Sequence, residues 1–298
     1  MEDNSISVMN DMADQLSSWP QPVITSYELG RIFSSVTPTP LSRTTYDSLL
    51  DALKAVKLVS AHKDFHGAVY KLFGKTDVLP AAVACSADPF AYLSHLSAMS
   101  FHGITDRLPK TLYLCTPPSP EWNEEARHRM AKDLGERLAE YNEAKLPQLR
   151  YVLGDKIGSA NLHVLRRSKR GAFKIIKDRG IRVATIGRTF LDMLREPEMC
   201  GGMQHVIDTY KEYASNHLAL ICTEVDQDGN AIEKVRAGYL LKDVCGLNHP
   251  TIEGWRAFAQ RGGSRKLDPN EEYASYYSEE WQISINVPSL MPNNAGDD

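Results

Sequence analysis

The feature that most constrains the fold is a change of hydrophobic period within the first 76 residues. Apolar residues first recur at the spacing of a helix, and they are Tyr46, Leu49, Leu50, Leu53 and Val56. In the next segment, KLVSAHKDFHGAVYKLF (residues 57–73), the period becomes two from Val69 to Phe73. A period near 3.6 predicts a helix with one buried face, and a period of two predicts strands, here joined by a turn near residues 63–67. The two patterns together predict a helix followed by a β-hairpin.

Two more helices are predicted before this one. A first helix near the N-terminus is ended by the proline-containing stretch WPQP. Thr25 and Glu28 have the spacing of a capping box, so a second helix is expected to begin at Thr25. Ser42 is a suitable N-cap for the helix that carries the apolar stripe. The order of three helices and a hairpin is that of a winged helix-turn-helix, and residues 1–76 are predicted to form one.

In a winged helix-turn-helix that binds DNA, the second helix of the pair enters the major groove by its N-terminal residues. The hairpin contacts the backbone or the minor groove. The residues predicted to contact DNA are Ser42, Arg43, Thr44, Thr45, Ser48, Lys54, Lys63 and His66. This surface is only mildly basic, so specificity is expected to depend on a few base contacts. A helical domain that binds protein is the alternative, because the connection between the two helices is longer than a simple turn.

The rest of the chain is predicted to be a second, larger domain of mixed α/β structure. Residues 77–87 are expected to be a linker, residues 88–290 the domain, and residues 291–298 a flexible tail. The expected fold class is therefore α+β, with an N-terminal winged helix-turn-helix domain and a larger mixed α/β C-terminal domain.

The segment AYLSHLSAMSFHGITDRLP (residues 91–109) contains three serines and two histidines, which raises the question of catalysis. We expect a helix that Asp88 caps, that begins at Pro89, and that ends at Gly103 in a left-handed cap. Serines three residues apart share one edge of such a helix. A serine nucleophile requires a sharp strand-to-helix turn and an oxyanion hole, and the segment has no such motif. No catalytic residue is predicted.

The charge of the chain is unevenly distributed. The formal net charge is −4, but bases outnumber acids in residues 30–76 and more strongly in residues 150–188. The latter part is predicted to form a second surface that contacts phosphates, either of further DNA or of an RNA or protein partner. Its residues are Arg166, Arg167, Lys169, Arg170, Lys174 and Lys177. The alternative for this segment is a solvated β-hairpin.

Several functional classes are disfavoured by the sequence. The five cysteines are dispersed, with none at C-x-x-C spacing, so neither a disulfide framework nor a zinc site is predicted. No metal, cofactor, membrane span or signal peptide is expected, and the protein is predicted to be cytoplasmic and not an enzyme. The alternative is a magnesium-dependent, nuclease-like enzyme with a winged-helix reader, in which Asp192 and the nearby Glu196 and Glu198 hold the cation.

Four segments, in order, resemble the AbiEi-type antitoxins of type IV toxin–antitoxin systems. They are residues 88–116, DPFAYLSHLSAMSFHGITDRLPKTLYLCT; residues 181–207, IRVATIGRTFLDMLREPEMCGGMQHVI; residues 235–241, VRAGYLL; and the closing pair KLDP and WQISIN. The chain departs from the family pattern at Gly187, where an acidic residue is common, and at Lys242, where glutamate is usual. The predicted helix from Trp122 to Tyr141 also looks long for the family.

The resemblance implies a transcriptional repressor that autoregulates its operon. Its N-terminal domain is expected to bind inverted repeats in the promoter, in double-stranded DNA. Its C-terminal domain, residues 88–290, is expected to act as the antitoxin of a phage-defence system, against a nucleotidyltransferase toxin encoded next to it. A stable toxin–antitoxin complex is not expected in this family, and some members are regulators without a neighbouring toxin.

Overall fold

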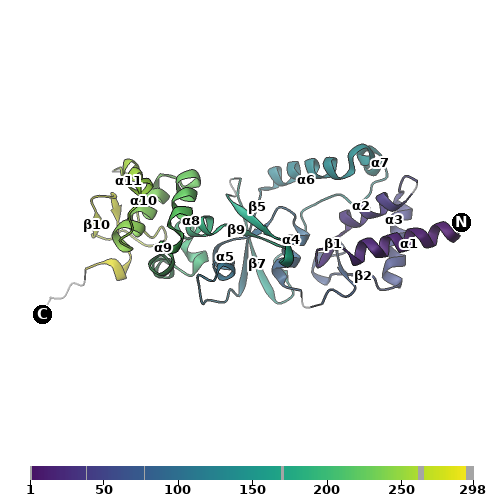
Figure 1. Cartoon of the computed structure of the whole chain (residues 1–298), viewed down its shortest axis with the longest axis horizontal. Helices are drawn as coiled ribbons and strands as arrows, with labels where there is room; N and C mark the ends of the chain where they lie inside the picture. The colour runs from purple at the N-terminus through teal and green to yellow at the C-terminus, as the bar shows by residue number, and fades with distance from the viewer. Residues whose placement is uncertain (1, 38, 77, 169–170, 261–264, 293–298) are drawn as a thin grey trace. The chain divides into compact units, whose positions relative to one another are not determined.

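The structure, a computed structural model, describes residues 2–37, 39–76, 78–168, 171–260 and 265–292. It is a mixed α and β fold (Figure 1). The chain divides into two compact units, of which unit 1 consists of Met1–Tyr92, Lys110–Arg170 and Ile175–Arg182. Unit 2 consists of Leu93–Pro109, Gly171–Lys174 and Val183–Asp298. Unit 1 therefore includes much more of the chain than the first 76 residues.

Helices and short strands form the N-terminal part of unit 1. They are α1 (Glu2–Ser17), β1 (Val23–Thr25), α2 (Ser26–Val36), α3 (Arg43–Ala55), β2 (Val59–Ala61) and β3 (Val69–Leu72). The three strands form an antiparallel sheet in the order β1-β3-β2, with Lys71 of β3 opposite both Val23 and Ser60. The predicted hairpin is thus confirmed, and β1 adds a strand that the sequence pattern did not indicate.

The local sequence explains where α2 and α3 begin. The Thr25 hydroxyl accepts a hydrogen bond from the Glu28 amide at 3.1 Å, and the Glu28 carboxylate accepts one from the Thr25 amide at 2.9 Å. This confirms the capping box, and burial raises the pKa of Glu28. Ser42 caps α3 by accepting from the Thr45 amide at 3.1 Å. In the predicted stripe of α3, Tyr46, Leu50 and Leu53 are buried and Leu49 is partly buried, but Val56 is 59% exposed because the helix has already ended there.

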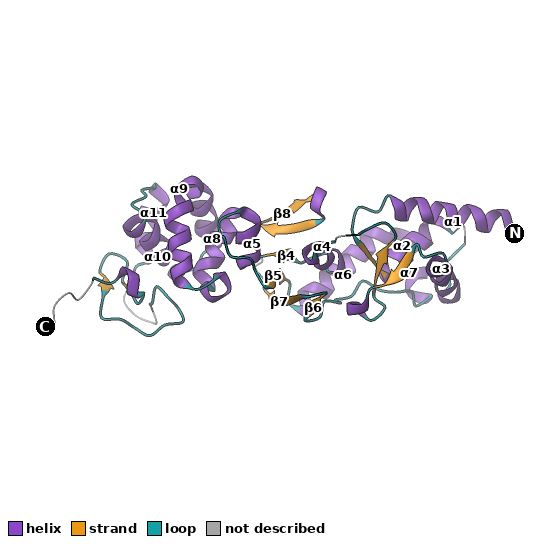
Figure 2. Ribbon diagram, turned by 90° about the horizontal axis from the view of Figure 1, so that it is seen from below, coloured by secondary structure: helices purple, strands orange, loops and turns teal. Residues whose placement is uncertain are grey.

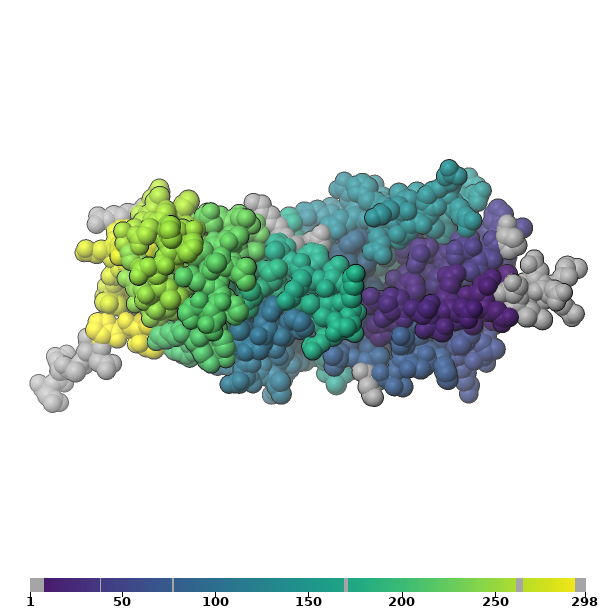
Figure 3. Space-filling model, viewed as in Figure 1, coloured from purple at the N-terminus to yellow at the C-terminus, as the bar shows by residue number. Residues whose placement is uncertain are grey.

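A helical arm packs on this N-terminal part. The expected helix from Trp122 to Tyr141 is two helices, α6 (Ser119–Leu134) and α7 (Leu138–Glu143), because Gly135 interrupts it with a positive φ of 54°. We call residues 119–150 the α6–α7 arm. Four buried arm residues share one core with α2 and α3, and they are Met130, Leu134, Tyr141 and Leu146. The arm lies against the N-terminal helices in the ribbon (Figure 1) and in the space-filling view (Figure 3).

Another sheet has six strands among the described residues. They are β4 (Tyr92–Leu93), β5 (Thr111–Thr116), β6 (Lys156–Ile157), β7 (Ala160–Arg166), β8 (Phe173–Ile176) and β9 (Ile181–Ala184), in the order β6-β7-β5-β4-β9-β8. β5 and β7 are parallel from Thr111↔Asn161 to Thr116↔Arg166. The segments KTLYLCT (residues 110–116), ANLHVLRR (160–167), AFKIIKD (172–178) and IRVAT (181–185) have the pattern of short strands, and β5, β7, β8 and β9 lie within them.

The segment expected to be a linker, residues 77–87, contains helix α4 (Pro80–Ala87). Asp88 ends α4 and does not cap a following helix, so that prediction was wrong. Its carboxylate is fully buried and accepts hydrogen bonds from the Phe90 amide at 2.9 Å, Thr116 Oγ1 at 2.7 Å and Trp122 Nε1 at 3.0 Å. An Asp-Pro pair occurs both where a helix ends and where one begins, so the sequence alone did not distinguish the two cases.

Helix α5 (His95–His102) begins later than predicted, with Ser94 at the N-cap, because residues 92–93 belong to strand β4. Its end agrees with the prediction, since Gly103 takes the left-handed conformation at φ 67°. The His102 ring Nε2 lies 2.8 Å from the Ala184 carbonyl oxygen, and burial lowers the pKa of His102. Arg107 donates to the Gly201 carbonyl at 2.7 Å. These contacts hold the turn after α5 in unit 2.

The remainder of unit 2 is mainly helical. Its helices include α8 (Ile186–Arg195), α9 (Met203–Asp228), α10 (Ala231–Tyr239) and α11 (Pro250–Trp255), which Figure 2 shows gathered together. Phe190, Tyr210 and Trp281 lie in their common core. The segment WQISINVP (residues 281–288) has a strand-like pattern, but only β11 (Ile283–Ser284) forms in it, and β11 pairs with β10 (Tyr277–Ser278). The end of the expected flexible tail, residues 293–298, lies outside the described residues.

Across the described part of the chain, none of the helices has the length and apolar character needed to cross a membrane.

Candidate nucleic-acid interface

The first turn of α3 brings three predicted contact residues together. Ser42 Oγ lies 2.9 Å from Thr44 Oγ1 and 2.8 Å from Thr45 Oγ1. All three residues are exposed, as is Ser48 one turn further along. The N-terminal end of a helix carries unsatisfied amide groups and a partial positive charge. Hydroxyl groups at such an end can hydrogen-bond to phosphate oxygens or to base edges.

The Arg43 side chain is engaged in contacts within unit 1. Its Nε donates to Asp47 Oδ2 at 3.1 Å, and its guanidinium carbon lies 5.6 Å from the centre of the Tyr46 ring. Its Nη1 donates to the Lys145 carbonyl oxygen, in the α6–α7 arm, at 3.4 Å. The side chain remains 53% exposed. Because an exposed ion pair contributes at most about 1 kcal/mol, Arg43 can exchange these contacts for a base or a phosphate at small cost.

The charges on the exposed face of α3 balance. Lys54 Nζ lies 3.2 Å from Asp51 Oδ1, and Arg43 pairs with Asp47, so each base has an acid about one turn away. Lys54 follows Arg43 by eleven residues (54 − 43), which is about 16 Å along a helix axis, so it does not adjoin the first turn. The exposed face of α3 is therefore neutral, and less basic than the surface expected from the sequence.

The connection between β2 and β3 carries the two other predicted contacts. Lys63 begins a short 3₁₀ turn (Lys63–Phe65), and His66 follows it in the left-handed conformation at φ 45°. Both side chains are exposed. The hairpin therefore presents Lys63 and His66 at its turn, as the sequence predicted.

The predicted contact set left out Lys71 and Lys75. Together with Lys63 they line a groove of about 710 Å³ that also includes Ile157, Gly158 and Ser159 of the β6–β7 turn. Burial and, after it, the charge of Lys71 lower the pKa of His62 at the edge of this groove. Lys71 could have been found from the sequence, since the strand alternation places it on the face opposite the buried Tyr70 and Leu72.

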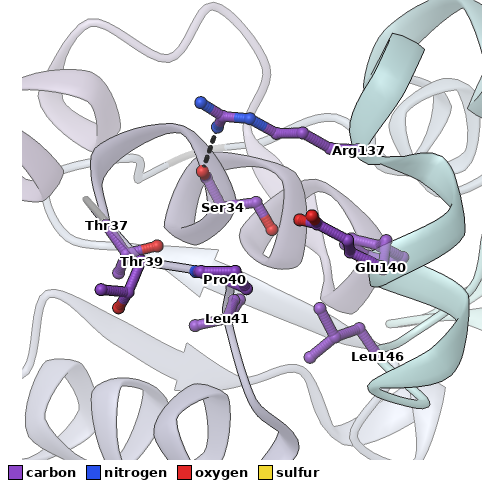
Figure 4. Close-up of a pocket in the computed structure, with 9 residues that line it drawn as sticks. Ser34, Thr37, Thr39, Pro40, Leu41, Arg137, Glu140 and Leu146 are labelled. Atoms are coloured by element: carbon purple, nitrogen blue, oxygen red, sulfur yellow. Dashed lines mark hydrogen bonds between the residues drawn. The ribbon is translucent and has the colours of Figure 1, made fainter.

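A small cavity of about 130 Å³ lies between the α2–α3 connection and the α6–α7 arm (Figure 4). The residues around it are Ser34, Thr37, Thr39, Pro40, Leu41, Arg137, Glu140, Tyr141 and Leu146. Figure 4 shows the Arg137 guanidinium reaching the Ser34 carbonyl oxygen, to which it donates a hydrogen bond. The arm thus braces the connection that leads into α3.

The second predicted anionic-partner surface is divided between strands. Arg166 and Arg167 lie at the end of β7, where the Arg166 guanidinium stacks 4.3 Å from the centre of the Tyr151 ring and donates to Ser119 Oγ at 2.9 Å. Lys174 lies in β8 and Lys177 in the turn after it, and β7 and β8 are not neighbours in the strand order. Lys169 and Arg170 lie outside the described residues. β8 and β9 are neighbours in the strand order and are joined by a short turn, an arrangement compatible with the solvated β-hairpin given as the alternative for this segment.

The carboxylates named for the nuclease alternative contact protein groups in unit 2. Asp192 is 1% exposed, and its Oδ1 accepts from Arg188 Nε at 2.9 Å. Glu196 lies 3.2 Å from the His95 ring, and Glu198 accepts from Asn270 Nδ2 at 2.8 Å. Among the residues that the structure describes, no group of three or more histidines, cysteines and acids is placed to hold a metal ion.

Residues that carry the family resemblance have structural roles in unit 2. The Arg236 guanidinium donates to the carbonyl oxygens of Leu194 at 3.0 Å and Lys266 at 2.9 Å. A Cβ on Gly187 would lie 2.4 Å from the Leu220 carbonyl oxygen, so no acidic side chain fits at this departure from the family pattern. At the other departure, Lys242 pairs with Glu253 at 2.8 Å and with Glu280 at 3.0 Å.

No protein-family model and no curated protein matches the chain. The chain is similar to the crystal structure of the RV2827C protein from Mycobacterium tuberculosis, with 13% sequence identity and a TM-score of 0.50. The similarity covers 93% of this chain and 90% of that one. At this level of identity the likeness concerns the fold alone.

Proposed function

We propose that this chain is a DNA-binding transcriptional repressor in which residues 1–76, braced by the α6–α7 arm, act as a winged helix-turn-helix. In this proposal α2 and α3 are the helix pair and the β2–β3 hairpin is the wing. The observation that carries it is the first turn of α3, where Ser42, Thr44 and Thr45 are exposed around a helix N-terminus. The proposed mode of binding inserts this turn into the major groove.

The contacts in this mode follow from the chemistry of each side chain. Arg43 leaves Asp47 and donates two hydrogen bonds to a guanine, the contact that arginine makes most often in the major groove. The hydroxyl groups of the first turn and of Ser48 bond to neighbouring bases or phosphates. Lys63 and His66 contact the backbone from the wing. Because the charges of α3 balance, non-specific binding is weak and specificity depends on these few groups.

The biological role in this proposal follows the resemblance to the AbiEi-type antitoxins. The chain binds inverted repeats in its own promoter, and unit 2 counters a neighbouring nucleotidyltransferase toxin in the cytoplasm without a stable complex. This role is tested by co-expression with the adjacent gene product: a growth defect that the chain does not relieve would refute the antitoxin role. The repressor carries out no catalysis, and intact plasmid after incubation with the protein and Mg²⁺ is the expected outcome.

Replacing Arg43 with alanine is expected to lower the affinity for the operator about tenfold, the lower part of the 1–3 kcal/mol that a bidentate guanine contact contributes. Asp47→Asn is expected to raise the affinity, because it releases the Arg43 guanidinium and removes a negative charge from the DNA-facing helix. Fluorescence anisotropy with the DNA upstream of the gene measures both effects. Arg127→Ala is the control, since Arg127 is an exposed residue of α6. Wild-type affinity in the Arg43 variant would exclude Arg43 as a base-reading residue.

A further inference from the structure

The loop that follows α7, residues 144–150, lies beside the first turn of α3. The Lys145 carbonyl oxygen accepts a hydrogen bond from Arg43 Nη1 at 3.4 Å. Leu146 lines the same small cavity as Leu41, the residue directly before the N-cap of α3 (Figure 4). Tyr141 lies in α7, and its Oη donates a hydrogen bond to the Pro147 carbonyl oxygen of the loop at 2.7 Å. These contacts attach the loop to the start of α3.

The exposed side chains of this loop are basic or polar. The segment AKLPQLR contains two bases and no acid. Lys145, Gln148 and Arg150 are exposed. Leu146 is 3% exposed and packs in the core that the arm shares with α2 and α3. Lys145 takes the left-handed conformation at φ 50°, which a non-glycine residue adopts infrequently. The loop thus has a buried leucine between two exposed bases.

We propose that the loop of residues 144–150 is a second DNA-binding site, in which Lys145 and Arg150 contact phosphates that flank the base pairs read by α3. This inference rests on the proposed function. The major groove of DNA is about 12 Å wide. When the first turn of α3 lies in this groove, the phosphates on either side of the groove lie close to the residues beside that turn. The loop is such a neighbour, and its two bases supply positive charge that the balanced face of α3 lacks.

The salt dependence of binding tests this proposal. Each phosphate neutralised by a protein base contributes about −0.9 to the slope of log K against log salt concentration. With the full-length chain and the upstream duplex, we expect Lys145→Gln and Arg150→Gln each to make the slope shallower by about 0.9, and the double variant by about 1.8. Discrimination between the operator and a shuffled duplex is expected to stay unchanged, because phosphate contacts carry no direct sequence information.

The matched control is Lys132→Gln, at an exposed position of α6 in the same arm, which is expected to keep the wild-type slope. A wild-type slope in the double variant would overturn the inference and leave the proposed function intact. An affinity loss that is equal at all salt concentrations would also overturn it, since it would make the loop a brace for α3 and not a phosphate site. Absence of binding by the wild-type chain at low salt would instead refute the proposed function, and this inference with it.

Discussion

Replacing Tyr141 with alanine is expected to lower the free energy of unfolding of unit 1 by about 3–5 kcal/mol, the usual range for a large buried aromatic residue. Tyr141 is 2% exposed and meets the Tyr27 ring edge to face, with 6.3 Å between ring centres. Its hydroxyl group donates to the Pro147 carbonyl at 2.7 Å. The substitution leaves a cavity beside α2 and removes the hydrogen bond that fixes the loop beside α3. Operator affinity is expected to fall with stability.

Gly30 of α2 provides a sharper test of the contact between Tyr141 and α2. A Cβ at this position would lie 2.3 Å from Tyr141 Oη, so Gly30→Ala is expected to destabilise the chain although alanine is the better helix former. In a Tyr141→Phe background the oxygen is absent and the nearest ring atom is Cζ at 3.2 Å, so Gly30→Ala is expected to cost less than it does in the wild type. Urea unfolding of the two single variants and the double variant gives the coupling energy. Additive effects would show that the arm does not rest on α2 at Gly30.

Replacing Arg188 with methionine is expected to cost about 3–5 kcal/mol in unit 2, because it leaves buried carboxylates without their cation. The Arg188 side chain is 1% exposed, with Asp192 at 2.9 Å, Asp228 at 3.4 Å and Glu224 at 3.9 Å. Burial is the largest cause of the raised pKa of Glu224, and the Arg188 charge opposes it. Arg188→Lys is expected to recover only part of the loss, since an ammonium group cannot reproduce the planar fork of donors.

Urea unfolding measures the stability change, and hydrogen exchange locates it in peptides from α8 and α9. Lys177→Met, at an exposed position, is the control and is expected to change stability by less than about 0.5 kcal/mol. Asp192→Ala is expected to destabilise unit 2 in the same way, because it removes the nearest partner of Arg188. A fully stable Arg188→Met variant would contradict the structural role assigned to this residue.

Features that depend on neighbouring residues could be predicted from the sequence. The capping box at Thr25, the N-cap at Ser42 and the left-handed Gly103 all depend on a few consecutive residues, and all three are present. The first turn of α3 was predictable for the same reason, since the buried stripe of the helix leaves Thr44 and Ser48 on the exposed side.

Contacts between distant parts of the chain could not be predicted in this way. Gly30 and Tyr141 are 111 residues apart (141 − 30), and no local pattern in either segment indicates the other. The hydrogen bond from Arg43 to Lys145 also joins residues that are distant in the sequence. The position of the loop beside α3 therefore could not be predicted from the sequence. The prediction that Asp88 caps a following helix was wrong. Its carboxylate accepts hydrogen bonds from Thr116 and Trp122, and these residues are distant from Asp88 in the sequence.

The most direct test of the proposed function is the affinity of the full-length chain for the duplex upstream of its gene, compared with a shuffled duplex of the same composition. Specific DNA-binding proteins typically prefer their site by about a thousandfold or more. We expect retardation of the upstream duplex at low salt, with a preference of at least about a hundredfold that persists at about 150 mM salt. Equal affinity for the two duplexes, or no retardation of either at low salt, would contradict the proposal that this chain is a sequence-specific repressor.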